Sequence, residues 1–506
     1  MSFQVCQLVL LPFFIFALTF SVLGAQNSSP KPVNAAEKIT SLLNSHPVVQ
    51  HGRFGYKFVN LESGEVLAAQ NSSNFFTPAS NTKLYTTAMA LVRLGAGYTF
   101  RTEVRTLTAW SSGQTAVGDL LLIGGGDPNL SSRMLPYTAD SPEVDPLLAL
   151  KQMAGQIARA GIREIQGDVV GVDTRYPGDA YPDGWTLNDS IYSYGAPVSS
   201  LTLNDNAAAL ILRPSQVGEL ANVETEPSLN GLIVLNQVVT GDSNSSHISF
   251  RRPPGSNEVV VWGTIGKSVD QWREDLGIPD PGLFAAEALT DLLRDRGITI
   301  RGEPRSEHRE SNDVSSGPRW SSGTLVAIHE SLPLSEAIRV VNKVSQNLHA
   351  EMLLREVAFC RTGVGTLENG TKEREAFLQE ANVTREGTGF SLADGSGLAR
   401  QDLTTPDSTI ALLRYMWGRP EREVWLRSLP IGGLDGSLQH RFRQIAGSQR
   451  VHAKTGSLSH VTALSGYVET RQHGWIAFSI MVNGITRHEA QVREFVDQLC
   501  SVFLDL

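Results

Sequence analysis

The sequence is poor in cysteine. It contains 3 cysteines in 506 residues, and Cys6 lies in the apolar stretch at the start of the chain. Cys360 ends an apolar helical pattern, and Cys500 lies on the apolar face of the last such pattern. Two cysteines in these settings do not make the disulfide framework of a small secreted domain. We therefore expect two buried free thiols and no cysteine nucleophile.

Positive charge is neither in excess nor clustered. The formal net charge is −9, and the lysines and arginines are dispersed along the chain. Because a nucleic-acid-binding surface needs a basic patch, we expect no nucleic-acid partner. The segments His329-Glu330 and His349-Ala350-Glu351 lack the second histidine of a zinc-binding helix. The sequence therefore predicts neither a metal site nor a cofactor.

Long apolar runs are absent except near the start of the chain. Residues 1–25 contain the run LVLLPFFIFALTFSVLGA, and polar residues follow it. This pattern is typical of a secretory signal peptide. Its first residues include no lysine or arginine and the run approaches spanning length, so an uncleaved membrane anchor is the alternative. Both interpretations predict an exported protein that is periplasmic or associated with the cell envelope.

The rest of the chain has the pattern of an α+β protein with a long insertion. A helix, a Gly-Ile pair and a short strand occur in this order twice, at 145–167 and 281–302, which indicates two halves of one domain. Short strands and turns dominate between these copies. We expect a signal peptide and three domains: 1–25 for the signal peptide; 26–98 with 321–506 for the catalytic domain; 99–178 with 271–320 for an inserted α+β domain; and 179–270 for a mostly β domain nested within it.

The most informative stretch is 75–97, FFTPASNTKLYTTAMALVRLGAG. Its apolar residues recur at helical spacing: Leu84, Ala88, Leu91 and Val92. Pro78 suits the first turn of this helix, and Ser80 and Lys83, three residues apart, would project from one face. A neighbouring base makes a serine hydroxyl nucleophilic. Taken alone, the pair favours an N-capping serine and a solvated lysine, so the partner motifs must decide.

Two further short motifs follow along the chain. Ser345 and Asn347 lie between two predicted helices, and Lys454-Thr455-Gly456-Ser457 lies on a predicted edge strand. A hydroxyl in a loop suits proton relay, an amide can hold a substrate peptide, and an edge strand supplies donors along it. Each motif alone is also compatible with an ordinary helix cap or strand end.

The residue types on the predicted edge strand suggest individual roles. Gly456 is expected to let a substrate approach closely, since a side chain would obstruct it. The charge of Lys454 favours a substrate carboxylate and disfavours a second ammonium group nearby. Lys83 could therefore remain neutral enough to act as a base.

The three motifs, in this order, resemble those of penicillin-binding proteins and serine β-lactamases. The long separation of Ser80 from Ser345 is similar to that in the class C low-molecular-mass penicillin-binding proteins. The chain also resembles this family in four short runs: Gly125 to Pro128, Asn342 to Asn347, Ala350-Glu351 and Asp394 to Leu398. The resemblance implies an α+β fold in which a transpeptidase-like domain, an antiparallel sheet between helices, carries a nested insertion of two further domains.

This resemblance also implies a function. The expected enzyme is a serine D-Ala-D-Ala carboxypeptidase or D,D-endopeptidase that acts on peptidoglycan stem peptides through an acyl-enzyme, so peptidoglycan peptides and β-lactams are its expected partners. The implied catalytic residues are Ser80, Lys83, Ser345, Asn347 and Lys454, and the implied substrate-binding residues are Thr455, Gly456 and Ser457. Backbone N–H groups of Ser80 and Ser457 would form the oxyanion hole. An oligomer is compatible with the sequence.

Two other functions agree with parts of the sequence. A serine β-lactamase would share the acylation chemistry and differ in rapid release of the opened lactam. A non-catalytic wall-binding or β-lactam-sensing protein would share only recognition. A sensor usually needs a membrane-spanning relay, and no second long apolar run follows residues 1–25.

Overall fold

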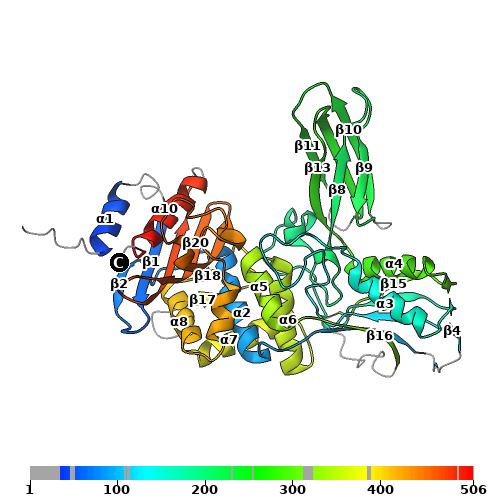
Figure 1. The fold of residues 1–506 in the computed structure, drawn as a ribbon, viewed down its shortest axis with the longest axis horizontal. Coiled ribbons are helices and arrows are strands. Elements are labelled where there is room, and N and C mark those ends of the chain that lie inside the picture. Colours follow the sequence, from blue (N-terminus) through cyan, green and yellow to red (C-terminus); the bar gives the residue numbers. More distant parts are fainter. Residues whose placement is uncertain are drawn as a thin grey trace, which may run out of the picture.

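The computed structural model describes residues 35–45, 52–107, 110, 114–228, 232–253, 256–310, 323–383, 389–486 and 489–504. The signal peptide expected at 1–25 and Cys6 lie outside the described residues. Figure 1 shows a body of helices around one sheet, a second body containing α3 and α4, and an upright β arm between them. Among the described residues, no helix combines the length and the apolar character that a membrane crossing requires.

The first body is built on a five-stranded antiparallel sheet. Its strand order is β19-β20-β21-β1-β2, with β1 and β2 forming a hairpin. The strands are β1 (Arg53–Asn60), β2 (Val66–Gln70), β19 (Val451–Leu458), β20 (Val461–Glu469) and β21 (Trp475–Asn483). The strand that carries the Lys454 motif, β19, lies at the edge of the sheet, as the sequence predicts.

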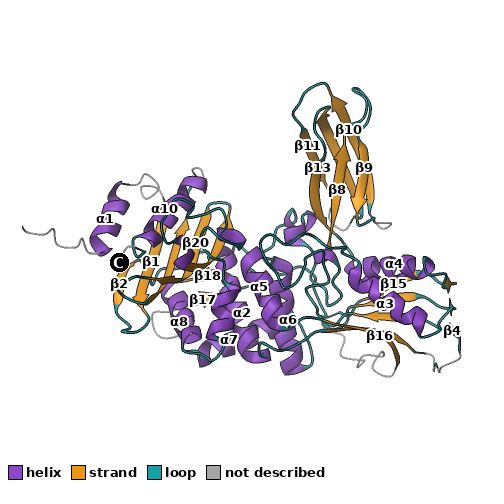
Figure 2. Cartoon of the chain, viewed as in Figure 1, coloured by secondary structure: helices purple, strands orange, loops and turns teal. Residues whose placement is uncertain are grey.

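Helices cover both faces of this sheet, because its strands are apolar on both sides (Figure 2). Ala477 and Phe478, successive residues of β21, belong to two different apolar cores. One core includes α1 (Ala35–Ser45) and α10 (Glu489–Ser501). The other includes α2 (Thr82–Leu94), α5 (Leu334–Val344), α6 (Asn347–Thr362), α7 (Leu367–Glu380), α8 (Pro406–Trp417) and α9 (Arg422–Ser428). The expected antiparallel sheet between helices is confirmed.

The two cysteines of the described chain are both free, and only one of them is buried. Cys500 lies in the core beneath α10, as expected. The expected burial of Cys360 is wrong: the last turn of α6 extends past the core, and Cys360, Arg361 and Thr362 are exposed there.

The second body contains the two repeated segments, which pair with each other. Its larger sheet has the order β15-β7-β5-β3-β16, and a small sheet has the order β14-β6-β4. The strands of the two repeats form the parallel pair β14·β6, the strands that follow the repeats form the parallel pair β15·β7, and α3 and α4 share an apolar core. The elements are α3 (Leu148–Arg159), α4 (Pro281–Arg294), β3 (Arg101–Thr106), β4 (Ala116–Val117), β5 (Leu120–Ile123), β6 (Glu164–Ile165), β7 (Val169–Val172), β14 (Thr299–Ile300), β15 (Pro304–Glu307) and β16 (Thr324–Glu330).

The upright arm consists of two three-stranded sheets, β10-β12-β11 and β13-β8-β9 (Figure 1). Its strands are β8 (Ala207–Arg213), β9 (Asn222–Glu226), β10 (Ile233–Gly241), β11 (His247–Arg251), β12 (Glu258–Gly266) and β13 (Trp272–Gly277). Buried residues of both sheets, such as Leu210 and Val261, form one core.

Strand pairing moves two of the boundaries suggested by the sequence to later residues. Strand β13 pairs with β8, so the mostly β segment continues to Gly277 and not to the expected residue 270. Strand β16 pairs with β3 in the second body, so the chain returns to the first body after Glu330 and not at residue 321. Short strand patterns do not identify the partner strand, which explains both differences.

Candidate active site

Ser80 lies just before α2, in a 3-10 turn formed by Ala79–Asn81. The sequence predicts it within the first turn of the α-helix. Ala79 has a φ of 49°, a left-handed conformation that is uncommon for a residue with a side chain. Such a conformation costs about 1–3 kcal/mol and persists where the surroundings enforce it. Two contacts do so: Gly397 packs directly against the Ala79 carbonyl, and the Asn81 Nδ2 donates to the Lys454 carbonyl at 3.2 Å.

The Lys83 amine is fully buried and touches three oxygens. Its Nζ lies 2.9 Å from Ser80 Oγ, 2.6 Å from Asn347 Oδ1 and 2.7 Å from the Ser396 carbonyl. Burial lowers the pKa of Lys83 to about 7, although nearby acidic side chains oppose this shift. An uncharged amine can donate to Asn347 and Ser396 while its lone pair accepts the Ser80 hydroxyl proton. The arrangement therefore suits a general base.

The second and third motifs meet beside this amine. Ser345 ends α5 with a φ of 67°, and Lys454 Nζ donates to Ser345 Oγ at 2.8 Å and to the Thr455 carbonyl at 2.9 Å. Burial, together with the charge of Lys83, lowers the pKa of Lys454. The structure thus brings all five residues implied as catalytic into one cluster, from the turn before α2, the α5–α6 connection and β19.

The three residues after Lys454 have different surroundings. Thr455 is buried and donates from Oγ1 to Ser437 Oγ at 2.7 Å, whereas Ser457 is exposed on the edge strand. A Cβ at Gly456 would lie 2.4 Å from the Pro78 carbonyl oxygen. Glycine is therefore required for β19 to pack against the turn that carries Ser80. The sequence suggested another reason for a glycine at this position, namely that it leaves room for a substrate.

A buried loop that contains Asp394 and Ser396 supports the Lys83 amine. The Asp394 carboxylate accepts from the backbone N–H groups of Ser396, Gly397 and Ala399 at 3.1, 2.6 and 2.9 Å. These bonds shape the loop so that the Ser396 carbonyl faces Lys83. Glu351 on α6 accepts from the Gly395 N–H at 2.7 Å, and burial raises its pKa to about 7.

Sequence reasoning assigned no role to these supporting residues. Asp394 and Glu351 appeared only within short runs similar to the penicillin-binding family, and Ser437 lies in no motif. Within the part of the chain that the structure describes, no group of three or more histidine, cysteine or acidic side chains is placed to hold a metal ion.

The sequence profile of the D-Ala-D-Ala carboxypeptidase 3 (S13) family matches residues 35–503, which include every residue of this cluster. The chain belongs to this family. This S13 family member is 31% identical over 475 residues to the D-alanyl-D-alanine carboxypeptidase of Actinomadura sp. (strain R39), covering 91% of this chain and 83% of that protein. It is 25% identical to the D-alanyl-D-alanine carboxypeptidase DacB of Haemophilus influenzae, covering 93% and 91% of the two chains.

The fold of this S13 family member is also that of a solved relative. The crystal structure of penicillin binding protein 4 (dacB) from Haemophilus influenzae has a TM-score of 0.78 and 22% sequence identity, covering 92% of this chain and 99% of that chain. The resemblance to penicillin-binding carboxypeptidases that the motifs indicated is therefore confirmed, together with the expected fold. The interpretation as a serine-type D-Ala-D-Ala carboxypeptidase is confirmed at the level of the family.

Proposed function

We propose that the protein hydrolyses peptidoglycan stem peptides through an acyl-enzyme at Ser80. Membership of the S13 family supports the class of reaction. One observation carries the assignment of residues: the Lys83 amine is fully buried and lies 2.9 Å from Ser80 Oγ. A buried amine with a pKa of about 7 can take the serine proton at neutral pH, which an ordinary lysine cannot.

In the acylation step, Ser80 Oγ attacks the carbonyl carbon of the penultimate D-alanine while Lys83 Nζ accepts the hydroxyl proton. The C–N bond of the tetrahedral intermediate breaks when its nitrogen receives a proton. Ser345 is suited to deliver this proton because its hydroxyl is hydrogen-bonded to Lys454. The proton that Lys83 took from Ser80 then replaces it, so Lys83 is neutral again at the end of the step. The leaving group is D-alanine in a carboxypeptidase reaction and a cross-linking diamino acid in an endopeptidase reaction.

In the deacylation step, water attacks the ester carbonyl while neutral Lys83 accepts a proton from it, and Lys83 passes this proton to Ser80 Oγ as the ester C–O bond breaks. We assign the oxyanion hole to the backbone N–H groups of Ser80 and Ser457. Thr455, Ser457 and Lys454 would hold the terminal carboxylate of the substrate. A β-lactam would acylate Ser80 by the same route, but its leaving nitrogen remains attached to the acyl group, which favours a long-lived adduct.

The decisive experiment is digestion of purified sacculi by the wild-type protein and by Ser80→Ala, with products identified by mass. We expect loss of terminal D-alanine, cleavage of cross-links or both with the wild type, and neither with the variant. Rapid turnover of a chromogenic cephalosporin with intact sacculi would favour the β-lactamase alternative. Labelling by a fluorescent penicillin without any product would favour the non-catalytic binding protein.

We further propose that residues 1–25 act as an export signal, which would bring the enzyme to peptidoglycan in the periplasm or cell envelope. The apolar run and the polar residues after it support this assignment. Cell fractionation followed by mass analysis of the first peptide tests it. A mature chain that starts near residue 26 supports a cleaved signal, and an intact chain in the membrane fraction supports the anchor.

We also propose a division into three domains, with boundaries revised by strand pairing. The catalytic domain would comprise residues 26–98 and 331–506, the nested β domain residues 179–277, and the inserted α+β domain the remainder of the insertion. Limited proteolysis would test this division, because cleavage should concentrate at these boundaries.

A further inference from the structure

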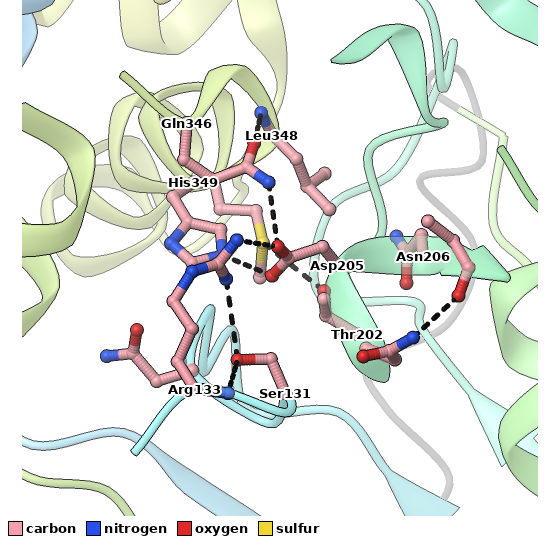
Figure 3. A network of polar contacts seen from close by, with 12 residues as sticks. Ser131, Arg133, Thr202, Asp205, Asn206, Gln346, Leu348 and His349 are labelled. Carbon is pink, nitrogen blue, oxygen red and sulfur yellow. Dashed lines mark hydrogen bonds and ion pairs between the residues drawn. The ribbon is translucent and has the colours of Figure 1, made fainter. Parts of the chain in front are cut away.

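The inserted region reaches the Ser345-Gln346-Asn347 turn at two points: Asn347 Nδ2 donates to the Tyr194 carbonyl at 2.8 Å, and the Asp205 carboxylate contacts Gln346. Asp205, just before β8, accepts from Gln346 Nε2 at 2.9 Å, and its other oxygen lies 2.8 Å from His349 Nε2 (Figure 3). Gln346 is the residue between Ser345 and Asn347. Asp205 therefore contacts the catalytic turn itself and, through His349, the first turn of the helix that follows it.

Gln346 transmits this contact because both ends of its amide are engaged. Its Oε1 accepts from the Leu348 N–H at 3.0 Å, which caps the start of α6, while its Nε2 donates to Asp205. Loss of the Asp205 contact would free the Gln346 side chain. The turn would then lose one of the contacts that keep Ser345 2.8 Å from Lys454 and Asn347 2.6 Å from Lys83.

The backbone that presents Asp205 is strained. Asn204, Asp205 and Asn206 have φ values of 50°, 56° and 51°, so three successive residues with side chains are left-handed. Such conformations are unfavourable for residues with side chains and persist only where the surroundings enforce them. Amide hydrogen bonds enforce this turn: Asn204 Nδ2 donates to the Ala207 carbonyl at 2.9 Å, and Asn206 Nδ2 donates to the Pro197 carbonyl at 2.8 Å.

Charge and burial show that this carboxylate is held in its ionised form. Asp205 is 8% exposed and His349 is 0% exposed, and the Arg133 guanidinium forms an ion pair with Asp205. Burial raises the pKa of Asp205, but Arg133 and His349 outweigh burial and lower it overall. Burial lowers the pKa of His349, so its neutral ring can donate from Nε2 to Asp205.

We propose that Asp205 is a positioning residue that makes the inserted region part of the catalytic machinery, because it orients the Ser345-Gln346-Asn347 turn through Gln346 and His349. Asp205 does not touch the reacting atoms, so its effect must appear in the alignment of Ser345 and Asn347. This inference rests on the proposed function of Ser80.

The first test compares acylation by a fluorescent penicillin in the wild type, Asp205→Asn and Glu356→Gln. Glu356 is a matched control: it is a buried carboxylate on α6, paired with Arg175 of the insertion at 2.7 Å, but it lies two helical turns beyond Asn347. We expect Asp205→Asn to lower the acylation rate constant about 10- to 100-fold, because small misalignments cost this much. Glu356→Gln should lower the melting temperature without changing that rate constant.

The number of sites labelled at saturation separates alignment from folding, because a misfolded fraction lowers this number and not the rate constant. A wild-type rate constant in Asp205→Asn would overturn the proposal, as would an equal loss in Glu356→Gln. Full labelling of Ser80→Ala would instead overturn the proposed function, so the two failures are distinguishable.

A second test reverses the hydrogen bond and does not depend on Asp205→Asn alone. Gln346→Glu would place two carboxylates against each other and slow acylation. The double variant Asp205→Asn with Gln346→Glu restores one donor and one acceptor, and a glutamate oxygen can still cap α6. We expect the double variant to acylate faster than either single variant. A double variant as slow as the product of the two single effects would contradict positioning through Gln346.

Discussion

Burial and neighbouring charges shift the pKa of the Lys83 amine in opposite directions. Burial disfavours the ammonium form and is the larger effect, while Asp394, Glu351 and Asp402 favour that form. The balance puts the pKa of Lys83 at about 7. A lysine deprived of these acids would be neutral at still lower pH, and an exposed lysine would be charged throughout the physiological range.

The first prediction concerns the pH dependence of acylation. Only the uncharged Lys83 amine accepts the Ser80 proton, so the acylation rate constant should rise about tenfold per pH unit below pH 7 and level off above it. Stopped-flow labelling with a fluorescent penicillin between pH 5 and 9 measures this profile. A rate constant that is flat or falls from pH 5 to 7 would exclude Lys83 as the base.

The second prediction concerns Gly456, whose added Cβ would lie 2.4 Å from the Pro78 carbonyl. Gly456→Ala should push β19 away from the Ser80 turn, lower the free energy of unfolding by about 1–3 kcal/mol and slow acylation. Gly97→Ala is the matched control, because a Cβ at Gly97 would meet nothing within 4 Å. Denaturant unfolding and acylation rates check both variants, and equal effects at the two positions would contradict the packing argument.

At the scale of elements, one histidine connects β15, β7 and α4 in the insertion. His308 follows β15, and its ring nitrogens lie 2.9 Å from Asp173, after β7, and 3.3 Å from Asp280, the N-cap of α4. Hydrogen bonding to Asp173 and then to Asp280 raises the pKa of His308 to about 10. The charged ring therefore stabilises the junction of these three elements.

The third prediction follows from the raised pKa of His308. Because the pKa of His308 is higher in the folded state than its ordinary value of about 6.5, the stabilisation is complete below pH 6.5 and is lost as pH rises to 10. His308→Gln should thus lower the free energy of unfolding by about 1 kcal/mol at pH 6, a modest effect because the half-exposed ring is screened by water. The difference should vanish by pH 10. Thermal unfolding across this range measures it, and a difference that grows with pH would contradict the assignment.

At the scale of the whole molecule, the insertion is joined to the catalytic helices by buried polar contacts. Glu356 on α6 accepts from Arg175 at 2.7 and 2.9 Å and from the Tyr176 hydroxyl at 2.6 Å. Its side chain is fully buried, and Tyr98 also donates to it. Together with the contact between Asp205 and Gln346, this contact means that the insertion is held near both ends of α6.

The fourth prediction is that Glu356→Gln loosens this junction. Removing one partner of a buried ion pair costs about 3–5 kcal/mol. We expect the lower end here, because the Arg175 side chain is 18% exposed and keeps some contact with water. We expect a lower melting temperature and, in calorimetry, an early transition from the insertion that separates from the main one. A single unchanged transition would show that Glu356 does not join the two parts.

Local chemistry could be predicted from the sequence because it depends on neighbouring residues. The helix after Ser80, the edge position of β19 and the ordered motifs around Ser80, Ser345 and Lys454 all follow from periodicity, turn residues and side-chain type. The family resemblance followed from the same short runs. These features do not require knowledge of which distant segments pack together.

Only the tertiary structure decided the properties that depend on distant partners. The partners of β13 and β16, the exposure of Cys360, the burial that lowers the pKa of Lys83 and the contact of Asp205 with Gln346 all result from packing between remote segments. Gly456 shows the difference most directly: the sequence alone identified the glycine, and the Pro78 carbonyl supplied its reason. Desolvation and close packing are sums over the whole fold, so a local pattern does not contain them.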